Sequence, residues 1–401
     1  MNSDNGMQKI RRGVAEIYTA EDLQRKLENS AKTGRQLRVK FGADPSRPDL
    51  HLGHSVVLRK LREFQDLGHK LIIIIGDFTA MIGDPSGRSK TRPALSLAET
   101  RANGKSYQEQ VTRILDPDPS KFELHYNSEW LEPLGAAGLI QLAQSQTVAQ
   151  ILQRDDFAKR FAANSPIGIH ELMYPILQAY DSVAINADIE FGGTDQTFNC
   201  LMGRELQKQR GLDPQVVLIL PLLVGLDGKD KMSKSLDNYI GITEPSEVIF
   251  KKAMTIPDNL LLQYVELCTA LDLDEAKERV RNDAYEAHKW LAREFVRLYH
   301  GAAAVEQAEK RYATVATGVT PDAMPEVIFE RSSAPGGSVA LVQLATSIGL
   351  TASKGEARRL TANGGLKVDG EKITDPNAVV QLSKNVVLQR GKDKFIKVIF
   401  R

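Results

Sequence analysis

The chain has 401 residues, enough to bury more than one core and to divide into roughly two to four domains. Its hydrophobic content of 42% and charged content of 26% are ordinary for a globular protein. Two cysteines are too few for a disulfide framework, and no run of 18 apolar residues predicts a membrane-spanning helix. The first twelve residues are polar and contain no apolar signal segment, so we expect a cytoplasmic protein.

The first strongly patterned segment predicts a strand, a helix and a second strand. Residues 37–43 form a short apolar run, residues 52–67 carry an apolar helical face that ends before Gly68, and residues 71–75 are continuously apolar. A continuously apolar strand is typical of a parallel sheet that is covered on both faces. We therefore expect a β-α-β unit in a Rossmann-like α/β domain.

Two histidines, His51 and His54, lie at the entrance of this helix in the string His-Leu-Gly-His. Free N–H groups and the positive end of the helix dipole favour a polyphosphate there, and Gly53 would let a nucleotide approach the backbone closely. Two other interpretations are histidines that only satisfy the helix start and half of a metal site. No cysteine and no His-Glu-x-x-His string lies nearby to support a metal.

Further strands and two helical blocks follow along the chain. A helix near residues 20–31 precedes the sheet, residues 96–165 are mainly helical and interrupt the sheet, and strands resume at 187–191 and 215–224. A second helical block covers residues 245–316. The expected domains are a catalytic domain at 1–230 with a helical insertion at about 96–165, a loop at 231–244, an α-helical domain at 245–325, a linker at 326–338 and a small α+β domain at 339–401.

A lysine-rich loop follows the strand at 215–224 and carries the string Lys231-Met-Ser-Lys-Ser. Such a loop is usually only solvated, but open α/β sheets bind ligands at the carboxyl ends of their strands. Lys231 and Lys234 are suited to neutralise the charge of a departing pyrophosphate, and Ser233 and Ser235 add neutral donors. With the two histidines, this loop indicates an enzyme that opens ATP between its α- and β-phosphates to activate a carboxylic acid.

Two shorter patterns indicate the rest of a pocket. Tyr174, Gln178 and Asp181 are spaced so that they share one face of a helix, although an ordinary polar helix face has the same spacing. The pair Gly192–Gly193 removes side chains where a ribose must approach, and Asp195 could accept hydrogen bonds from the ribose hydroxyls.

Charge is unevenly distributed along the chain. The net charge is +1, but residues 351–401 hold eleven Lys or Arg against five Asp or Glu, a net charge of +6, which leaves −5 for the first 350 residues. A basic segment on a slightly acidic body predicts a surface that binds a polyanion. Arg358 and Arg359 lie in a short predicted helix of this segment. A solvated face on a small α+β domain is the alternative.

This ordered set of motifs resembles the class I aminoacyl-tRNA synthetases, and among them the bacterial tyrosyl-tRNA synthetases, over nearly the whole chain. Besides the two ATP strings, the resemblance rests on Gly83-Asp84-Pro85-Ser86-Gly87, Tyr174-x-x-x-Gln178-Ala179-Tyr180-Asp181 and Gly192-Gly193-Thr194-Asp195-Gln196. The basic C-terminal segment resembles the small S4 RNA-binding module of that family. The resemblance implies a tyrosine–tRNA ligase: tyrosine and ATP give tyrosyl-adenylate and pyrophosphate, and tyrosine then passes to the terminal ribose of its tRNA.

The resemblance also implies partners. They are L-tyrosine, ATP with Mg²⁺ on the pyrophosphate oxygens, the tRNA and a second copy of the chain in a homodimer, with the insertion at 96–165 as the candidate interface. No tightly bound protein metal is expected.

Roles for single residues follow from the same resemblance. Catalysis is assigned to His51, His54, Lys231 and Lys234, and ATP binding to Asp44, Ser46, His51, Gly53, His54, Gly192, Gly193, Asp195, Met232 and Lys234. Tyrosine binding is assigned to Lys40, Asp77, Thr79, Asp84, Tyr174, Gln178, Asp181 and Gln196, and tRNA binding to Arg88, Arg92, Arg358 and Arg359. Within the pocket, Asp181 would accept from the phenol while Tyr174, Gln178 and Asp84 hold the ammonium group, and phenylalanine would leave Asp181 unpaired.

One position departs from the family pattern. Before the Gly-x-Asp-Pro loop the family commonly has a tyrosine as second partner of the substrate phenol, and alignment through Gly42 and Asp44 puts Lys40 there. Asp77 also stands at the end of the next strand, where a small residue is expected. We hypothesise that Lys40 and Asp77 pair and rebuild the pocket floor. Tryptophan stays open as the substrate, because the tryptophanyl enzymes share both ATP strings.

Other classes of protein carry only part of this pattern. A small-molecule nucleotidyltransferase can hold His-x-Gly-His in the same context, but it needs neither a basic C-terminal segment nor this length. A non-enzymatic RNA-binding relative would be expected to lose histidines or lysines from the ATP strings, and none is lost. Dinucleotide-binding and P-loop enzymes are excluded because neither glycine-rich string is complete.

Overall fold

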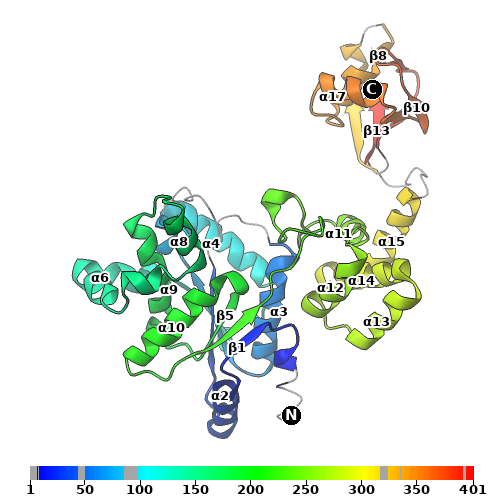
Figure 1. Ribbon diagram of the computed structural model, residues 1–401. Helices are drawn as coiled ribbons and strands as arrows, with labels where there is room; N and C mark the ends of the chain where they lie inside the picture. Colours follow the sequence, from blue (N-terminus) through cyan, green and yellow to red (C-terminus); the bar gives the residue numbers. More distant parts are fainter. Residues whose placement is uncertain are drawn as a thin grey trace. The chain divides into compact units, whose positions relative to one another are not determined.

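The computed structural model describes residues 7, 9–43, 50–84, 97–316, 324–334, 336–391 and 394–401. By compactness the chain divides into two units, Met1–Phe295 and Val296–Arg401. The division falls inside helix α14 (Ala284–His300) and therefore inside the helical domain expected at 245–325. Figure 1 shows the order of the elements along the chain.

The first unit is built on a six-stranded sheet in the order β1-β6-β5-β2-β3-β4. Five of these strands are parallel, and β1 pairs antiparallel with β6 at one edge. Their bounds are β1 (Glu16–Tyr18), β2 (Arg38–Ala43), β3 (Lys70–Ile75), β4 (Phe122–Tyr126), β5 (Ile189–Gly193) and β6 (Val216–Leu220). The continuously apolar strands β3 and β6 are buried almost throughout, as expected for a sheet covered on both faces.

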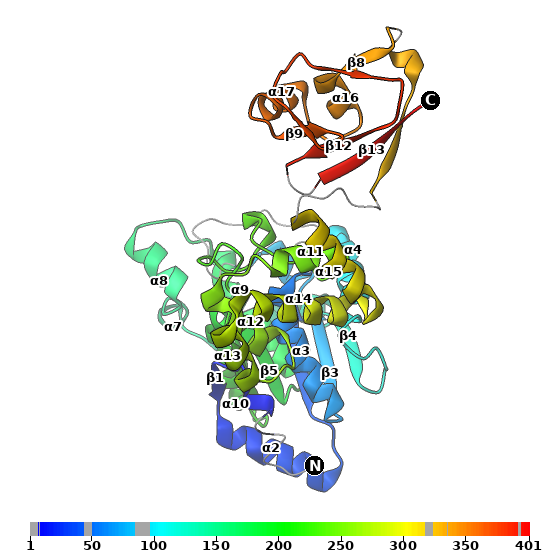
Figure 2. The same ribbon diagram turned by 90° about the vertical axis from the view of Figure 1, so that its right-hand side faces the viewer.

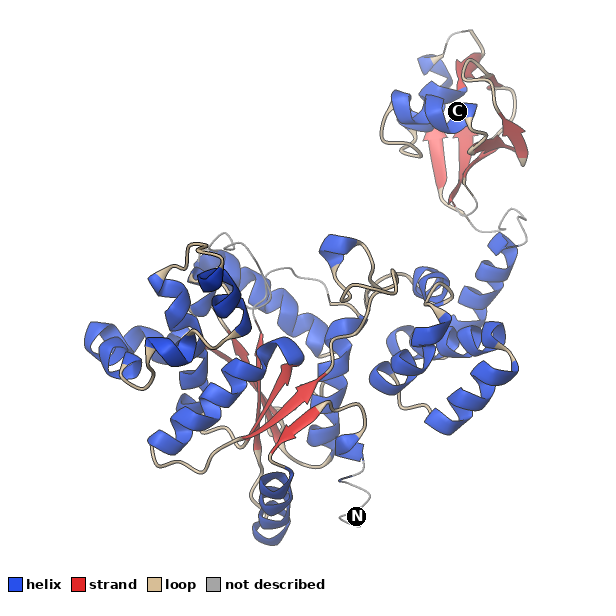
Figure 3. Cartoon of the chain, viewed as in Figure 1, coloured by secondary structure: helices blue, strands red, loops and turns tan. Residues whose placement is uncertain are grey.

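Helices cover both faces of this sheet (Figures 1 and 3). On one face Phe64 of α3 packs edge-on against Phe191 of β5, with ring centroids 5.5 Å apart, and α3 runs beside β3 (Figure 2). On the other face α10 packs against α9 and on β5 and β6. The helices around the sheet are α2 (Ala20–Thr33), α3 (Leu52–Asp66), α4 (Leu97–Val111), α9 (Ile169–Ala184) and α10 (Thr197–Gln209).

The insertion expected to be mainly helical at 96–165 also contains a sheet strand. Strand β4 pairs in parallel with β3 over residues 122–126 and so extends the sheet, contrary to the prediction that this segment only interrupts it. Strand β4 lies at the edge of the sheet, and of its residues Phe-Glu-Leu-His-Tyr only Phe122 is buried. The short helices after it are α5 (Ser128–Leu131), α6 (Gly135–Ala143), α7 (Val148–Ile151) and α8 (Asp155–Ala162).

Helices dominate the segment after the sheet. They are α11 (Ser246–Ala253), α12 (Leu261–Cys268), α13 (Leu273–Asn282), α14 (Ala284–His300) and, in the second unit, α15 (Ala303–Ala316). Helix α12 packs on α3, the helix that carries His51 and His54 at its start. In the described part of the chain, no helix combines the length and apolar character needed to cross a membrane.

The rest of the second unit is a small α+β domain with its own apolar core. A five-stranded sheet in the order β10-β9-β12-β13-β7 and a two-stranded sheet of β11 and β8 accompany two helices. The elements are β7 (Glu326–Phe329), β8 (Ser338–Ala340), α16 (Leu341–Ser347), α17 (Lys354–Ala362), β9 (Leu366–Val368), β10 (Glu371–Ile373), β11 (Val379–Gln381), β12 (Val386–Arg390) and β13 (Lys394–Phe400). The linker predicted at 326–338 is wrong at its start, because β7 pairs in parallel with β13 and belongs to this domain.

Candidate active site

The side chains of the two histidines form the start of helix α3 by accepting hydrogen bonds from backbone N–H groups of its first residues. His51 is the N-cap, and its Nδ1 accepts a hydrogen bond from the N–H of Gly53 at 3.1 Å. In return the N–H of His51 donates to Nδ1 of His54 at 3.2 Å. The rings stack at a tilt with centroids 3.9 Å apart. The interpretation as helix-capping histidines is therefore correct for the Nδ1 atoms and leaves the Nε2 atoms to be explained.

Both histidines are neutral at pH 7. Burial lowers the pKa of His51 to about 2, helped by the neighbouring His54 and by the charge of Lys234. Burial and Lys234 likewise lower the pKa of His54 to about 4. A neutral ring whose Nδ1 accepts must carry its proton on Nε2. Each histidine can therefore donate from Nε2 to a phosphate oxygen without needing a positive charge.

Gly53 is required by the histidine beside it. A Cβ atom at this position would lie 2.9 Å from Cε1 and 3.0 Å from Nδ1 of His51, and 3.6 Å from Cβ of Met232. The missing side chain thus makes room for the His51 ring, whereas the sequence suggested room for a nucleotide. Met232 belongs to the lysine-rich loop, so Gly53 is also a point where the two ATP strings meet.

Backbone pairing joins the two strings. His51 forms an isolated antiparallel bridge with Gly241, in which the N–H of Leu52 donates to the carbonyl of Ile240 at 2.9 Å. The N–H of Ile242 donates to the carbonyl of Leu50 at 3.1 Å. Segment 240–242, which follows the loop, is therefore fixed to the start of α3.

Asn238 holds the loop from inside. Its side chain is buried, accepts from the N–H of Ser233 at 2.7 Å, and donates to the carbonyl of Lys231 at 3.2 Å and to Oδ2 of Asp227 at 2.5 Å. Gly225 must lack a side chain because a Cβ atom there would lie 2.3 Å from Nδ2 of Asn238. The sequence predicted Gly225 only as a residue that releases the chain into the loop, and it did not indicate Asn238, since a lone Asn in a loop carries no distinctive spacing.

The two lysines of the loop point toward the groups predicted to bind ATP. Nζ of Lys231 lies 3.3 Å from Oδ2 of Asp195. Lys234 begins a 3-10 turn, η4 (Lys234–Leu236), and acts on the pKa of both histidines. Its Nζ lies 5.8 Å from the ring centroid of Tyr239, whose ring is 6.1 Å from that of His51.

The glycine pair at the end of β5 also lies where side chains do not fit. A Cβ atom on Gly192 would lie 2.8 Å from Sγ of Cys200, and one on Gly193 would lie 2.8 Å from Oδ1 of Asp195. The pair therefore lets the turn η3 (Thr194–Gln196) fold back beside the strand end. This turn carries Asp195 and Gln196.

The polar face predicted on helix α9 is buried. Tyr174 and Asp181 are 4% and 3% exposed. Oδ1 of Asp181 accepts from the indole Nε1 of Trp130 at 2.8 Å, and Oδ2 accepts from Nδ2 of Asn127 at 3.5 Å. Burial raises the pKa of Asp181 to about 7, against the opposing effects of Lys40 and of these two donors. The sequence did not indicate Trp130 or Asn127, because both lie about fifty residues from Asp181 and show no motif.

Other predicted tyrosine contacts lie around the same helix. Oε1 of Gln178 is buried and has no hydrogen-bond partner within the described protein. Thr79 is buried and accepts from Asn127 at 3.0 Å. Nε2 of Gln196 donates to Oδ2 of Asp84 at 2.8 Å, which brings together two residues that are 112 positions apart.

The predicted pair between Lys40 and Asp77 is wrong. Lys40 lies 2.7 Å from Oε1 of Glu190. Asp77 instead accepts from the N–H and Oγ of Ser128, at 2.9 and 2.7 Å, and lies 3.3 Å from Nε of Arg101. Lys40 and Glu190 are paired in register on the neighbouring strands β2 and β5, which is why their side chains meet on one face of the sheet.

Four predicted residues fall outside the described part of the chain: Asp44, Ser46, Arg88 and Arg92. Arg358 and Arg359, in contrast, are exposed on α17. Among the described residues, no group of three or more His, Cys, Asp or Glu side chains could hold a metal ion.

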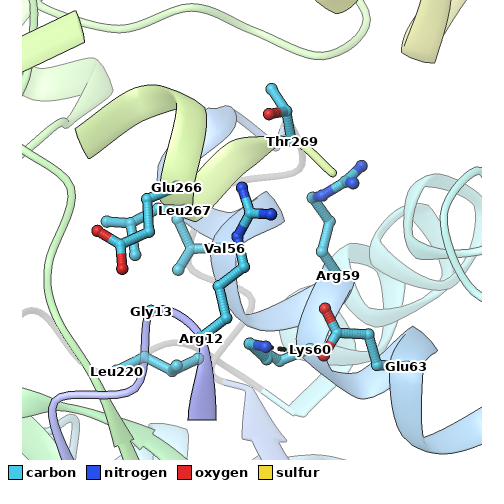
Figure 4. Close-up of a pocket in the computed structure, with 10 residues that line it drawn as sticks. All are labelled: Arg12, Gly13, Val56, Arg59, Lys60, Glu63, Leu220, Glu266, Leu267 and Thr269. Atoms are coloured by element: carbon cyan, nitrogen blue, oxygen red, sulfur yellow. Dashed lines mark hydrogen bonds and ion pairs between the residues drawn. The ribbon is translucent and has the colours of Figure 1, made fainter. Parts of the chain in front are cut away.

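A pocket is lined in part by residues of α3 (Figure 4). It is lined by the N-terminal segment, α3 and α12, with Lys60 paired to Glu63 at 2.7 Å. The Arg12 guanidinium donates to the carbonyls of Val265 and Leu271, at 3.3 and 2.8 Å. These bonds join α12 to the N-terminal segment, which Lys60 of α3 contacts in turn at the carbonyl of Lys9, at 2.6 Å. No predicted site residue lines the pocket.

Comparison with known proteins agrees with this geometry. A family model described as tRNA synthetases class I (W and Y) matches residues 32–316. The chain belongs to this family of class I tRNA synthetases. A second model, described as the tyrosine–tRNA ligase SYY-like C-terminal domain, matches residues 320–398 of the synthetase. That match begins before β7 and supports the domain start seen in the structure.

Relatives of the synthetase match over its full length. The tyrosine–tRNA ligase of Deinococcus radiodurans is 53% identical over 98% of this chain and 96% of its own length. That of Geobacter sulfurreducens is 49% identical over the whole of both chains. Among solved structures, the truncated mitochondrial tyrosyl-tRNA synthetase of Coccidioides posadasii shares the fold, with a TM-score of 0.62 and 24% identity over 77% of this chain and 92% of that chain. The Rossmann-like fold expected from the sequence is thereby confirmed.

Proposed function

We propose that this synthetase is a tyrosine–tRNA ligase, which activates L-tyrosine with ATP and transfers it to the 3′-terminal ribose of tRNA(Tyr). The observation that carries the proposal is a buried pair of acceptors on α9. The carboxylate of Asp181 and the unpartnered Oε1 of Gln178 suit the two ends of tyrosine, its phenol and its ammonium group. Full-length relatives are named tyrosine–tRNA ligases.

Activation needs orientation and charge stabilisation from the protein. The tyrosine carboxylate attacks the α-phosphorus of ATP, and the bond from that phosphorus to the bridging oxygen of pyrophosphate breaks. The Nε2–H groups of His51 and His54, at the free N–H end of α3, donate to the phosphates. Lys231 and Lys234 neutralise the charge that develops on pyrophosphate. Mg²⁺ enters with the substrate as MgATP, carried by phosphate oxygens and water.

ATP and tyrosine contacts complete the pocket. Asp195 accepts from the ribose hydroxyls beside Gly192 and Gly193, and Met232 packs at the adenosine side together with Gly53. Tyr174, Asp84 and Gln196 surround the ammonium and carboxylate groups of tyrosine, with Gln196 fixed by its bond to Asp84. Asp44, Ser46, Arg88 and Arg92 remain predicted contacts of ATP and of the tRNA end.

Tryptophan is the competing substrate, since the matched family includes both specificities. An indole N–H could also donate to Asp181. The match of the C-terminal residues to a tyrosine–tRNA ligase domain supports tyrosine.

The decisive test is ATP–pyrophosphate exchange by the purified full chain with each amino acid supplied alone and tRNA omitted. Exchange with tyrosine, lost in Lys234→Ala, is the expected result. Exchange with tryptophan alone would overturn the tyrosine assignment, and well-folded protein without any exchange would overturn the enzymatic function.

The C-terminal domain is proposed to bind tRNA through α17. Arg358 and Arg359 are exposed there, and Glu356 is occupied by Arg390 at 2.7 Å, which leaves the helix face basic. Charge reversal of both arginines should weaken aminoacylation and leave ATP–pyrophosphate exchange unchanged. Equal aminoacylation by the variant and the parent would reject this surface.

A homodimer in the cytoplasm is the proposed working form. The insertion and the start of α9 carry exposed apolar side chains: Ile140 is 63%, Val148 60%, Phe161 65% and Ile169 83% exposed. A second copy of the chain would cover them. Light scattering should give the mass of a dimer, and Phe161→Glu should shift it toward the monomer.

A further inference from the structure

Lys40 and Glu190 form an ion pair with almost no access to solvent beneath the amino-acid pocket. Their side chains are 0% and 2% exposed, and Nζ lies 2.7 Å from Oε1. A lysine ammonium has three N–H donors. Here the three acceptors are Glu190, Oγ of Ser182 at 2.7 Å and the carbonyl of Gln178 at 3.3 Å. Lys40 has therefore no donor left for a substrate phenol.

Two of these acceptors bracket Asp181 on helix α9. Gln178 lies three residues before Asp181 and Ser182 directly after it. Glu190 is held in turn by Oγ of Ser182 at 3.2 Å and by the amide of Gln215. Gly203 leaves room for this network, since a Cβ atom there would lie 2.8 Å from Nε2 of Gln215 and 2.9 Å from Oγ of Ser182. The lysine thus ties the turn of α9 that carries Asp181 to the sheet.

Charges on two strands and two neutral donors act on Asp181. Burial raises the pKa of its carboxyl, the positive charge of Lys40 on β2 and the donors Trp130 and Asn127 lower it, and the negative charge of Glu190 on β5 raises it. The Asp77–Arg101 pair is bonded to Ser128, the residue after Asn127. Lys40 and Glu190 therefore act on the charge of Asp181 in opposite directions.

We propose that Lys40 and Glu190 are positioning residues: together they fix the orientation of Asp181, and their opposite charges set the degree to which it is ionised and thereby the preference for tyrosine over phenylalanine. The inference rests on the proposed function, because it concerns the same pocket. An ionised carboxylate rejects phenylalanine strongly, since phenylalanine would remove the phenol donor and leave the buried charge with only Trp130 and Asn127. A protonated carboxyl rejects it less. Tyrosine selection thus uses one direct acceptor and a buried ion pair behind it.

Substitutions of Lys40 and of Glu190 should shift the pH dependence of tyrosine binding in opposite directions, which the loss of a merely structural pair would not do. Lys40→Met removes the positive charge, so the midpoint of the pH dependence of tyrosine binding should rise by about one pH unit. Glu190→Gln removes the negative charge and should lower this midpoint by about one pH unit. The double variant, which leaves no unpaired charge, should fall between them. Tyrosine binding is measured by calorimetry without ATP from pH 5.5 to 8.5.

The discrimination between tyrosine and phenylalanine provides the second measurement. At pH 7 the ratio of kcat/KM for tyrosine to kcat/KM for phenylalanine, measured by ATP–pyrophosphate exchange, should fall about tenfold in Lys40→Met. In Glu190→Gln it should not fall. If Lys40→Met does not fold, Glu190→Gln alone decides, since a midpoint that stays unchanged or rises overturns the proposal.

A matched control is the buried Lys26 of α2, which is 2% exposed and lies 2.6 Å from Asp213 and 3.4 Å from Asp188. Lys26→Met should lower the stability and leave the pH midpoint unchanged. Shifts of both pocket variants in the same direction, or equal to that of Lys26→Met, would show a structural role only. Absence of exchange with tyrosine in the parent chain would instead overturn the proposed function, and the inference with it.

Discussion

Nζ of Lys231 lies 3.3 Å from Oδ2 of Asp195, so the first lysine of the Lys231-Met-Ser-Lys-Ser string is paired with the carboxylate proposed to receive the ribose. The two side chains are 55% and 28% exposed. A pair exposed to this degree contributes little, on the order of 0–1 kcal/mol. Bound ATP can therefore replace this ion pair, because its ribose hydroxyls donate hydrogen bonds to Asp195 and its phosphates pair with Lys231.

Lys231→Gln tests whether Lys231 acts on the phosphates of bound ATP. The variant keeps a donor but loses the positive charge, and we expect kcat for tyrosine activation to fall about 100-fold, the usual loss for one group that stabilises a transition state. The KM for ATP should change by less than about threefold, because the lysine acts mainly on the departing pyrophosphate. Lys229→Gln, in the same loop, serves as the control in the exchange assay. A large rise in KM with unchanged kcat would contradict the proposed role.

Gly53→Ala should damage catalysis through His51. The added Cβ would lie 2.9 Å from the His51 ring, so the ring must move away from its bond with the N–H of Gly53. Crowding of this kind costs about 1–3 kcal/mol of stability, and kcat for activation should fall at least tenfold. Urea unfolding and ATP–pyrophosphate exchange measure the two effects. Gly355→Ala, whose Cβ would meet only Oγ of Ser353 at 3.9 Å, should leave both unchanged.

The strands and helices that carry strong apolar patterns were predictable from the sequence. The runs at 37–43 and 71–75 and the helix at 52–67 coincide with β2, β3 and α3 within one residue. Strand β4 was missed, because it is short, only partly buried and lies between helices. Strand β7 was missed for another reason: its pairing partner β13 lies about seventy residues later, which no local pattern reveals.

The candidate site was predictable for residues that are themselves part of a sequence motif. His51, His54, Lys231 and Lys234 needed only their strings, and the structure brings both strings together at Gly53 and Met232. The partner of Lys40 was not predictable in this way, because it depends on strand register. Asp77 is closer to Lys40 in sequence but accepts a hydrogen bond from Ser128. Glu190, in contrast, is in register with Lys40 on the neighbouring strand β5.

Asn238→Ala should disorganise the lysine loop while the fold persists. The substitution removes one bond to Ser233, one to Lys231 and one to Asp227, and leaves the N–H of Ser233 without its acceptor. We expect kcat for activation to fall at least tenfold, with tyrosine affinity unchanged because the α9 pocket is not touched. Calorimetric titration with tyrosine is the control measurement. Loss of tyrosine binding together with activity would point to global unfolding and would count against a local role.

The histidines should make the fold sensitive to acid. Their pKa values in the folded protein, about 2 for His51 and about 4 for His54, lie below the ordinary value of 6.5. The unfolded chain therefore binds protons first, so the stability contributed by the neutral rings is present above pH 6.5 and is lost as pH falls toward 4. His54→Gln should reduce the slope of the free energy of unfolding against pH by up to about 1.4 kcal/mol per pH unit. Urea unfolding at pH 7, 6 and 5 measures it, and an equal slope in both proteins would refute it.

Asp181 should give tyrosine binding its own pH dependence in the parent protein. Burial raises the pKa of this carboxyl to about 7 from the ordinary 3.8. The folded protein thus keeps the proton more tightly than the unfolded chain, and the associated stability is lost as pH rises from about 4 to about 7. Tyrosine binding has the opposite trend. The phenol donates to the ionised carboxylate, so affinity should increase as pH rises toward 7 and level off above it.

Asp181→Asn removes the titrating group and separates these effects. The amide keeps the size of the side chain and an oxygen acceptor for Trp130, but it carries no charge. We expect tyrosine affinity to fall about tenfold or more at pH 8 and to become independent of pH between 6 and 8. Rejection of phenylalanine should weaken at the same time, because no buried charge loses a donor when the phenol is missing. Calorimetry at pH 6, 7 and 8 decides the matter, since a variant that keeps the pH dependence of the parent would show that another group titrates.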